Sequence, residues 1–226
     1  MRVLELWRYP VKTMAGERLQ RAQLGPMGIA GDRIVHVEDA HGRVITSRSH
    51  PRFLGHKCML GEDGEPRVDG RLWRDREVTA DVVDIVGPGA ALVRYDGAER
   101  FDVLPLLVAT DGAIAAFGHD GRRLRPNIIV GGVEGMDERA WPGKCLRAGK
   151  VLIGVQDLRQ RCIMTSFDPD TQIQDKQITR SIFQRFDGKL ALNCFVLEGG
   201  ELSVGDEVQL VRGRACADDI GPDASL

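Results

Sequence analysis

Short segments in which apolar and polar residues alternate dominate the first hundred positions of the chain. A two-residue period is typical of strands that have one face in the core and the other in solvent. Turns rich in glycine, proline and acidic residues separate these segments, at 25–28, 61–64 and 87–89. We therefore expect strands at 2–8, 19–24, 33–38, 43–46, 71–73 and 78–86, arranged as a small barrel or curved sheet.

The second half of the chain combines longer apolar runs with two short helices. A buried strand at 103–108 leads into Thr110 and Asp111, which can cap a helix that ends at Phe117. Further strands are expected at 127–130, 146–155, 191–197 and 207–211. Between them, Thr179 can cap a second helix. The apolar residues of that helix recur at helical spacing on one face, which assigns to the core Ile178, Ile182, Phe183 and Phe186.

The 27 glycines among 226 residues favour many turns over long helices. We therefore expect a mainly β protein with a few short helices. The change of character near residue 100 predicts two domains, a smaller N-terminal β-barrel or sheet at 1–100 and a second β-barrel at 101–214. Residues 215–226 are small, polar and acidic, without apolar periodicity, and predict a flexible tail.

The 31 basic and 33 acidic side chains give a net charge of −2, so no overall field attracts nucleic acid or a membrane surface. The basic residues gather locally instead, at 43–57, 122–125 and 159–161. No run approaches the ~18 apolar residues that span a bilayer. The five cysteines are odd in number, include no C-x-x-C pair and follow no apolar leader, which indicates a cytoplasmic protein. We expect a monomer that binds neither nucleic acid nor membranes.

One cysteine lies between arginines, in the sequence RQRCIMT at 159–165. Cys162 follows an apolar strand and precedes a turn that Asp168 and Pro169 favour, so we expect it near a barrel rim. Neighbouring guanidinium charge favours the thiolate, which is the form that attacks substrates and binds metals. The simpler alternative is a buried free cysteine, which is common in protein cores.

Five short motifs follow one another along the chain. They are YPVKT at 9–13, GDR at 31–33, RPNI at 125–128, RC at 161–162 with Thr165 and DP at 168–169, and VGD at 204–206. Each motif is weak alone, but their order over nearly the whole chain resembles the molybdenum cofactor sulfurase C-terminal (MOSC) domain family. The first half is similar to the N-terminal β-barrel companion of that domain, and the architecture is similar to that of the amidoxime-reducing and hydroxylaminopurine-resistance members.

The resemblance implies a β-barrel that holds molybdenum on a pterin dithiolene, with Cys162 as the protein ligand to the metal. A thiolate suits a metal that takes soft sulfur ligands. The phosphate of the pterin is an anion and needs charge-assisted donors. Lys12, Arg33 and Arg125 stand at the positions where the family binds the phosphate. The further cofactor-binding candidates are Thr13, Thr110, Asp111, Asn127, Gln160 and Arg161.

The three basic positions also have structural interpretations. Lys12 could be a surface lysine at a strand edge, and Arg125 could form a structural ion pair. Arg33 could pair with Asp32 or Glu38. These alternatives stay open at the level of the sequence.

Two positions depart from the family pattern. Gln160 stands where the reductase relatives carry serine, and Cys194 stands where they carry tyrosine. A longer side chain at Gln160 would narrow the substrate side of the metal. The chain carries no ferredoxin-like cysteine set, so electrons would have to come from a separate protein of the iron–sulfur or flavin type.

The implied activity is the two-electron reduction of N-hydroxylated compounds, such as amidoximes, hydroxylamines and N-hydroxylated bases, by oxygen transfer to molybdenum. An alternative from another class uses the same residues: a molybdenum-cofactor carrier, or a sulfur-transfer protein with a persulfide on Cys162. A third possibility is a cysteine hydrolase that pairs Cys162 with His50, His56 or His119. Turnover of an N-hydroxylated compound would separate the reductase from the carrier.

Overall fold

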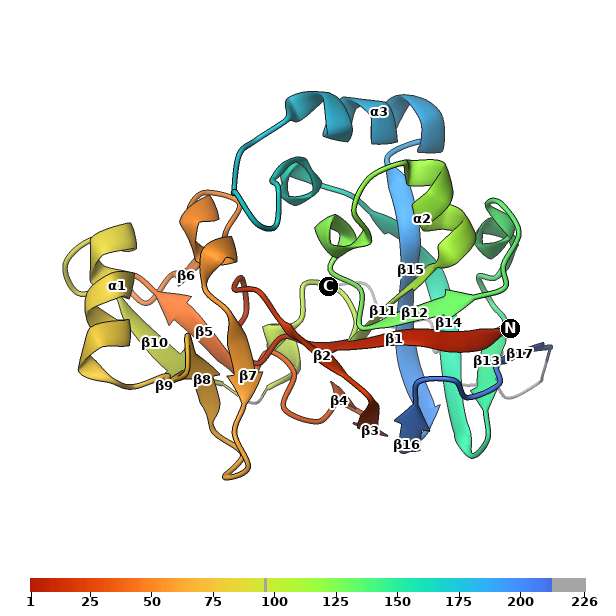
Figure 1. The fold of residues 1–226 in the computed structure, drawn as a ribbon, viewed down its shortest axis with the longest axis horizontal. Helices are drawn as coiled ribbons and strands as arrows, with labels where there is room; N and C mark the ends of the chain where they lie inside the picture. The colour runs from red at the N-terminus through yellow and green to blue at the C-terminus, as the bar shows by residue number, and fades with distance from the viewer. Residues whose placement is uncertain (96, 213–226) are drawn as a thin grey trace.

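The structure, a computed structural model, describes residues 1–95 and 97–212. Its framework is an eight-stranded sheet with the order β17-β13-β14-β15-β11-β12-β1-β2. The strands are β1 (Arg2–Arg8), β2 (Glu17–Leu19), β11 (Leu106–Thr110), β12 (Ile128–Gly131), β13 (Cys145–Ala148), β14 (Val151–Gln160), β15 (Lys189–Glu198) and β17 (Gln209–Val211). Neighbours are antiparallel except β11 and β12, which run parallel. The large sheet therefore joins the first strands of the chain to its second half (Figure 1).

Three small sheets extend this framework. They are β10-β5-β6 (Ala91–Arg94, Val35–Glu38, Val44–Ile45), β16-β3-β4 (Gly200–Ser203, Arg21–Gly25, Gly28–Ile29) and β7-β8-β9 (Cys58–Leu60, Pro66–Val68, Arg71–Leu72). The strand β16 returns from the C-terminal part of the chain to pair with β3. The other two small sheets lie together at the far end of the molecule from β17 (Figure 1).

Three α-helices and five short 3₁₀ turns connect the strands. The helices are α1 (Arg76–Val86), α2 (Asp111–Phe117) and α3 (Lys176–Phe186). The 3₁₀ turns are η1 (Pro51–Gly55), η2 (Ala98–Arg100), η3 (Gly121–Leu124), η4 (Asp137–Ala140) and η5 (Ile163–Ser166). The predicted helix up to Phe117 is confirmed as α2, and its N-cap is Thr110, whose side chain accepts a hydrogen bond from the backbone N–H of Ala113.

The strand predicted at 78–86 is wrong, because this segment is helix α1. Asp75 caps the helix by accepting a hydrogen bond from the backbone N–H of Glu77. Val78 and Val82 are buried one turn apart on the face that meets the core. The β-branched residues suggested a strand, but their helical spacing and the acidic cap decide the structure.

Other boundaries also differ from the prediction. The single strand expected at 146–155 is the hairpin of β13 and β14, which turns at Gly149, a glycine with a φ of 56°. The helix α3 begins earlier than predicted, since Asp175 rather than Thr179 caps it. Of its four apolar residues assigned to the core, Phe183 is 50% exposed while the other three are buried.

The predicted mainly β class is confirmed. Among the described residues the hydrogen-bonded ladder of the large sheet does not join β17 to β2, so that sheet is not closed into a barrel. The domain limits near residue 100 stay a prediction. The flexible tail predicted at 215–226 lies outside the described residues. None of the helices in the described part of the chain has the length and apolar character needed to cross a membrane.

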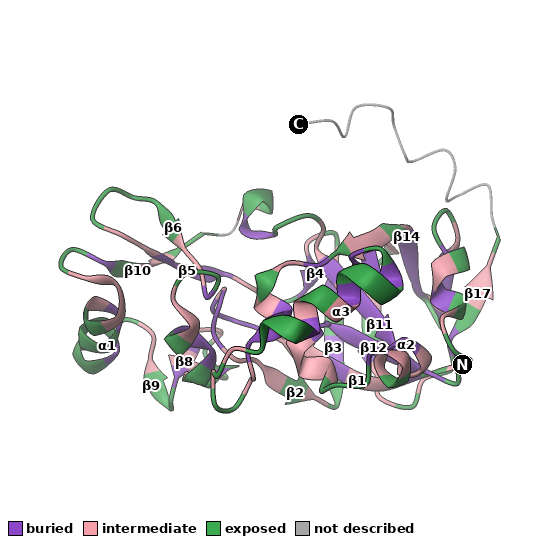
Figure 2. Cartoon of the chain, turned by 90° about the horizontal axis from the view of Figure 1, so that it is seen from above, coloured by how far each residue is buried: buried purple, intermediate pink, exposed green. Residues whose placement is uncertain are grey.

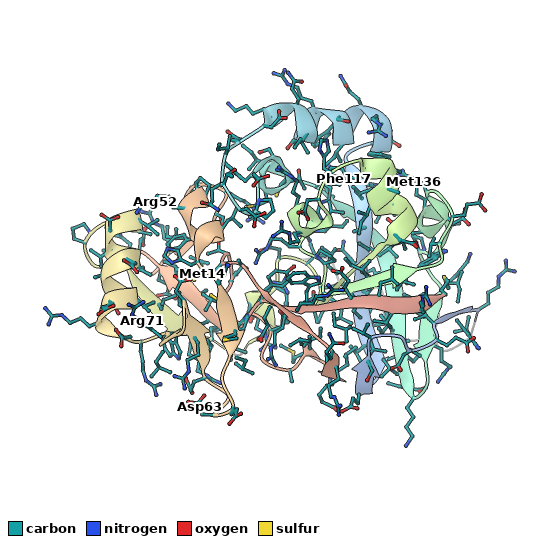
Figure 3. The ribbon with its side chains drawn as sticks, viewed as in Figure 1. Met14, Arg52, Asp63, Arg71, Phe117 and Met136 are labelled. Carbon is teal, nitrogen blue, oxygen red and sulfur yellow. The ribbon has the colours of Figure 1, made fainter. Side chains whose placement is uncertain are left out.

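The interior contains three main apolar clusters. The first fills the large sheet and includes Leu6, Val108 and Leu192. The second, with Met14, lies under β5, β10 and α1. The third packs α2 against α3, with Phe117 buried in it and Met136 against it (Figure 3). Buried residues in Figure 2 follow these clusters, whereas the outer face of α3 is exposed.

One buried carboxylate ties the large sheet to η4. Glu138 is fully buried, and its two oxygens accept hydrogen bonds from the hydroxyl of Thr110 (2.7 Å) and the backbone N–H of Ala191 (3.1 Å). Burial raises the pKa of Glu138 above its ordinary value of 4.5, although both hydrogen bonds act in the opposite direction. The side chain thus links the ends of β11 and β15 at a cost in desolvation.

We expect Glu138→Ala to lower the free energy of unfolding by about 2 kcal/mol or more, since it leaves two buried donors without partners. Glu138→Gln keeps an acceptor and should cost less than about 1 kcal/mol at neutral pH. Because the folded-state pKa is raised, the stabilisation by the wild-type carboxyl is complete below pH 4.5 and is lost as the pH rises through the folded pKa. Urea unfolding at several pH values measures both effects. Equal stabilities of the Ala and Gln variants would contradict the assignment.

Candidate functional site

A cavity lies where β14 ends and η5 begins, and it draws its walls from segments far apart in the sequence. It is lined by Lys12, Thr13, Arg33, Thr46, Arg48, Phe101, Asp102, Val103, Leu104, Leu106, Leu107, Leu124, Arg125, Asn127, Arg159, Gln160, Arg161, Cys162, Met164 and Asn193. Eight of the ten candidates from the sequence are in this lining, and only Thr110 and Asp111 are not. The four motifs at 9–13, 31–33, 125–128 and 161–162 therefore meet at one place.

Cys162 occupies the junction between β14 and η5. The preceding residue, Arg161, donates its backbone N–H to the carbonyl of Gly188 (2.8 Å). The Cys162 carbonyl accepts from the backbone N–H of Thr165 (3.2 Å) and from its hydroxyl (3.0 Å). These bonds fix the backbone on both sides of the thiol. The cysteine is neither disulfide-bonded nor fully buried, so the alternative of a buried core cysteine does not hold for it.

Asp102 is the acidic residue of the cavity lining, and sequence reasoning did not single it out. Its carboxylate pairs with Lys12 (2.9 Å), Arg48 (2.6 Å) and, at longer range, Arg159 (3.5 Å). Burial acts to raise the pKa of Asp102, but Lys12 and the two arginines outweigh it and hold the pKa at about 2. Three separate segments supply these cations, so no local pattern in the sequence could have indicated this cluster.

Arg48 connects the Asp102 cluster to Cys162. Burial acts to lower the pKa of Arg48, but the Asp102 charge and the Cys162 sulfur outweigh it and raise this pKa. The guanidinium of Arg48 thus stands within hydrogen-bonding reach of the Cys162 sulfur. Arg159, the second-to-last residue of strand β14, has its pKa lowered mainly by burial.

The GDR and RPN motifs meet through a buried carboxylate. Asp32 is fully buried and accepts hydrogen bonds from the backbone N–H of Tyr9 (2.7 Å) and from the side-chain amide of Asn127 (3.2 Å). It also forms an ion pair with Arg33, whose guanidinium donates to Asn127 as well (3.4 Å). The structural interpretation of Arg33 as a partner of Asp32 is therefore correct, and the same arginine lines the cavity.

Arg125 carries a charge that no carboxylate neutralises at short range. Its guanidinium lies over the ring of Tyr9, 4.2 Å from the centroid, and Arg33 lies 5.0 Å from the same centroid. Within residues 1–95 and 97–212 Arg125 makes no ion pair, so the structural ion pair considered from the sequence is not observed. Burial lowers the pKa of Arg125. Burial likewise raises the pKa of Tyr9 to about 12, which keeps the phenol neutral between the two cations.

Arg161 is a second buried guanidinium without a carboxylate. It is 8% exposed, donates to the carbonyl of Leu124 (2.9 Å), and leaves its Nε without a hydrogen-bond partner. Burial, followed by repulsion from Arg159, lowers the pKa of Arg161 to about 10. An unpaired buried donor is costly unless a ligand satisfies it.

Three cavity residues hold the backbone in the left-handed region. The φ angles are 82° at Thr13, 53° at Arg33 and 54° at Arg125. Such conformations cost roughly 1–3 kcal/mol each for residues other than glycine and persist where the surroundings fix them. Thr13 is fixed by Ser47, whose hydroxyl donates to the Thr13 carbonyl (2.6 Å). The strain directs these three side chains from tight turns into the site.

The two candidates outside the lining have structural roles. Thr110 caps α2 and donates to Glu138, as described above. The Asp111 carboxylate accepts from the backbone N–H groups of Gly112, Gly132 and Val133. Burial acts to raise the pKa of Asp111, but these hydrogen bonds lower it overall. Their assignment to the cofactor stays a prediction, without support from the cavity geometry.

The histidines considered as partners of Cys162 lie elsewhere. None of the cavity-lining residues in the described chain is a histidine. His56 pairs with Asp69 (2.8 Å), His50 contacts the hydroxyl of Ser49, and His119 packs its ring against Phe117. A cysteine hydrolase with one of these bases is therefore not supported.

No cluster of three or more histidine, cysteine or acidic side chains that could hold a metal occurs in residues 1–95 and 97–212. Cys162 is the one cysteine among the described residues that line the cavity. A metal bound here would have to bring most of its ligands with it, as an ion in an organic chelate does. The chemistry of the donor set thus points to a preformed metal complex rather than to a free ion.

A second cavity adjoins the first through Arg125 and Met164, which line both. Its walls include the aromatic rings of Trp7, Tyr9 and Phe167. The site can therefore accommodate a molecule that extends past Arg125 onto an aromatic surface.

Comparison with known proteins places this geometry in a family. The MOSC N-terminal beta barrel domain matches residues 1–72 and the MOSC domain matches residues 113–209, together more than half of the chain. Mitochondrial amidoxime-reducing component 1 of Homo sapiens is 24% identical over 92% of this chain and 82% of that protein. Mitochondrial amidoxime reducing component 2 of Macaca fascicularis is 22% identical over 77% of this chain and 69% of that protein.

A solved structure supports the fold as well. The YUAD protein from Bacillus subtilis superposes with a TM-score of 0.51 at 13% identity, covering 92% of this chain and 93% of that chain. At this identity the likeness concerns the fold alone. The family matches fall on the segments that bring Lys12, Arg33, Arg125 and Cys162 to one cavity, and the chain belongs to the MOSC domain family.

Proposed function

We propose that this protein binds a molybdenum cofactor in the cavity beside Cys162 and reduces N-hydroxylated compounds. The observation that carries the proposal is the charge of the lining, which has six basic side chains (Lys12, Arg33, Arg48, Arg125, Arg159, Arg161) and one acidic side chain, Asp102. Cations confined together repel one another, and an anionic ligand relieves that repulsion. The distant relatives named amidoxime-reducing components support the reaction class.

The residues present fit a pterin-bound metal. A chelated metal needs one further ligand from the protein, and Cys162 is a free, half-buried thiol. The phosphate of a pterin needs cationic donors, and the half-buried Arg125 and the buried Arg161 have no carboxylate partner among the described residues. When bound, the cofactor would supply the two-electron chemistry that side chains cannot perform.

The chain itself would bind, orient and shield. Lys12, Arg33 and Arg125 would hold the phosphate, while Arg48 would contact the sulfur of Cys162. Apolar side chains such as Leu107 and Met164 complete the walls and limit the access of water. Gln160 projects from the last position of β14 into the lining, next to the thiol, where it would limit the size of the substrate group.

The reaction consumes two electrons and two protons: R–NH–OH accepts both pairs and yields R–NH₂ and water. A separate protein would supply the electrons. The cofactor-carrier alternative uses the same cation cluster. One assay separates the two functions. With dithionite as the electron donor, a reductase loaded with cofactor would turn over benzamidoxime and a carrier would not.

We expect Cys162→Ser to lower the molybdenum content of protein purified from a cofactor-producing host by about tenfold, because a hydroxyl is a poor ligand for a soft site. The pterin content should fall much less, since the phosphate contacts remain. Elemental analysis and pterin fluorescence measure the two separately. Cys58→Ala, in the second apolar cluster, is the control and should leave both unchanged. Full retention of molybdenum in Cys162→Ser would refute metal ligation.

Two substitutions should change anion binding in opposite directions. Arg125→Gln removes an unpaired cation and should weaken pyrophosphate binding to the cofactor-free protein by roughly tenfold. Asp102→Asn frees Lys12, Arg48 and Arg159 from their counter-ion and should strengthen binding by roughly threefold to tenfold. Isothermal titration calorimetry measures both, with the surface substitution Arg52→Gln as the control.

The Asp102→Asn effect should be independent of pH over the neutral range. The pKa of Asp102 is held at about 2, so the wild-type carboxylate of the folded protein stays charged until the pH approaches that value. Its contribution to stability is therefore present above pH 3.8 and is lost as the pH falls toward 2. Weaker pyrophosphate binding by Asp102→Asn would show that the carboxylate organises the anion site instead of competing with the anion.

A further inference from the structure

The outer face of α3 carries a shallow groove that the proposed site does not use. It is lined by Ile163, Ser166, Lys176, Thr179, Arg180, Phe183 and Gln184. All of these residues belong to η5 or α3. Figure 1 shows α3 at the outer edge of the molecule, and Figure 2 shows its solvent-facing surface exposed. We call this feature the α3 groove.

Two large apolar side chains in the α3 groove are exposed. Ile163 is 40% exposed and Phe183 is 50% exposed, although both belong to types that proteins usually bury. The inward face of α3 already has its core residues, Ile178, Ile182 and Phe186. Phe183 is therefore surplus to the core, and an aromatic side chain at an exposed position is typical of the centre of a protein interface.

The charges of the α3 groove have one sign. Lys176 and Arg180 are exposed and form no ion pair within residues 1–95 and 97–212. No acidic side chain lines the groove, and the segment from Lys176 to Phe186 contains none. Arg185, the third basic residue of α3, is anchored by a hydrogen bond to the carbonyl of Ala116 (2.7 Å). An apolar centre flanked by free cations fits a partner with an apolar patch and carboxylates around it.

The α3 groove is next to the thiol. Ile163 directly follows Cys162 in the chain, and Thr179 in the groove contacts the hydroxyl of Thr165 (3.3 Å). The same Thr165 hydroxyl donates to the carbonyl of Cys162 (3.0 Å). Two hydrogen bonds therefore lead from the floor of the groove to the backbone of Cys162. A partner seated here would stand close to the reacting centre without entering the cation-lined cavity.

We propose that the α3 groove docks the electron donor, a small acidic protein with a one-electron [2Fe–2S] centre. This inference depends on the proposed function, because only a reductase needs a donor. Each cycle oxidises two reduced donor molecules by one electron each. The two electrons and two solvent protons cleave the N–O bond of one substrate to give the amine and water. Complementary charge would speed the encounter, and the apolar contact of Ile163 and Phe183 would hold the complex.

The test uses the cofactor-loaded full-length protein, an acidic [2Fe–2S] ferredoxin as the donor and benzamidoxime as the substrate. The variants are Lys176→Glu with Arg180→Glu, and separately Phe183→Ser. The matched control is Lys150→Glu with Arg21→Glu, which also reverses two exposed charges. Lys150 precedes the ten-residue strand β14 at the end away from Cys162, roughly 30 Å along the strand. Dithionite replaces ferredoxin in parallel assays and reports on the site itself.

We expect the charge-reversed groove variant to lose at least about tenfold in ferredoxin-driven rate at low ionic strength, with the loss shrinking as salt is added. Phe183→Ser should weaken ferredoxin binding with little dependence on salt. The control pair should match the wild type in both assays. Ferredoxin-driven rates that are equal in the wild type and both groove variants would overturn the docking proposal, as would a wild type that works with dithionite but not with ferredoxin.

The two proposals fail in different ways. A cofactor-loaded wild type that reduces no benzamidoxime with dithionite would refute the reductase, and the docking proposal would fall with it. A normal dithionite rate combined with unchanged ferredoxin binding in the groove variants would refute docking alone. Biolayer interferometry with immobilised ferredoxin measures that binding without turnover.

Discussion

Repulsion among six basic side chains gathered around one thiol is the constraint on which this structure depends. In water such charges would move apart, so the fold has to hold them and remove part of their solvation. It does so by four means: the shared carboxylate of Asp102, the buried Asp32, the ring of Tyr9 and the carbonyl of Leu124. These partners neutralise only part of the charge. The positive charge that is not neutralised favours the binding of an anion, and it is present before any ligand binds.

The sheet topology explains how these cations can be brought together at all. The strand β1 ends at the YPVKT turn, β12 follows the RPN motif, and β14 ends at Gln160, two residues before Cys162. Because β1 and β12 are direct neighbours in the large sheet, Tyr9 and Arg125 meet across 116 positions of sequence. Left-handed turns at Thr13, Arg33 and Arg125 then direct the side chains into one space. The surrounding sheet thus holds these three residues in strained backbone conformations that a flexible loop would relax.

The sequence predicted which motifs form the site, but it did not predict the ion pairs between their charged side chains. Eight candidate residues line one cavity. They could be predicted because the short motifs that contain them are typical of the family. Asp102 escaped notice since its partners, Lys12, Arg48 and Arg159, come from three other segments. The helix α1 was predicted as a strand because its β-branched residues favour strands, whereas the Asp75 cap and the helical spacing of Val78 and Val82 indicate a helix. Phe183 was assigned to the core because helical spacing gives a face but not its width.

Two different surfaces lie next to Cys162: the cation-lined cavity and the α3 groove, in which Phe183 is exposed. On one side, the cations and the adjoining aromatic cavity favour an extended anion. On the other side, η5 leads directly from Cys162 to an exposed apolar and basic surface on α3. A protein that only carried a cofactor would need the first side but would need no electron donor at the second. An enzyme that takes electrons from a partner needs both, because the anion site must stay occupied while the donor comes and goes. Under the docking proposal, the α3 groove would serve the electron donor while the cation-lined cavity serves the anion.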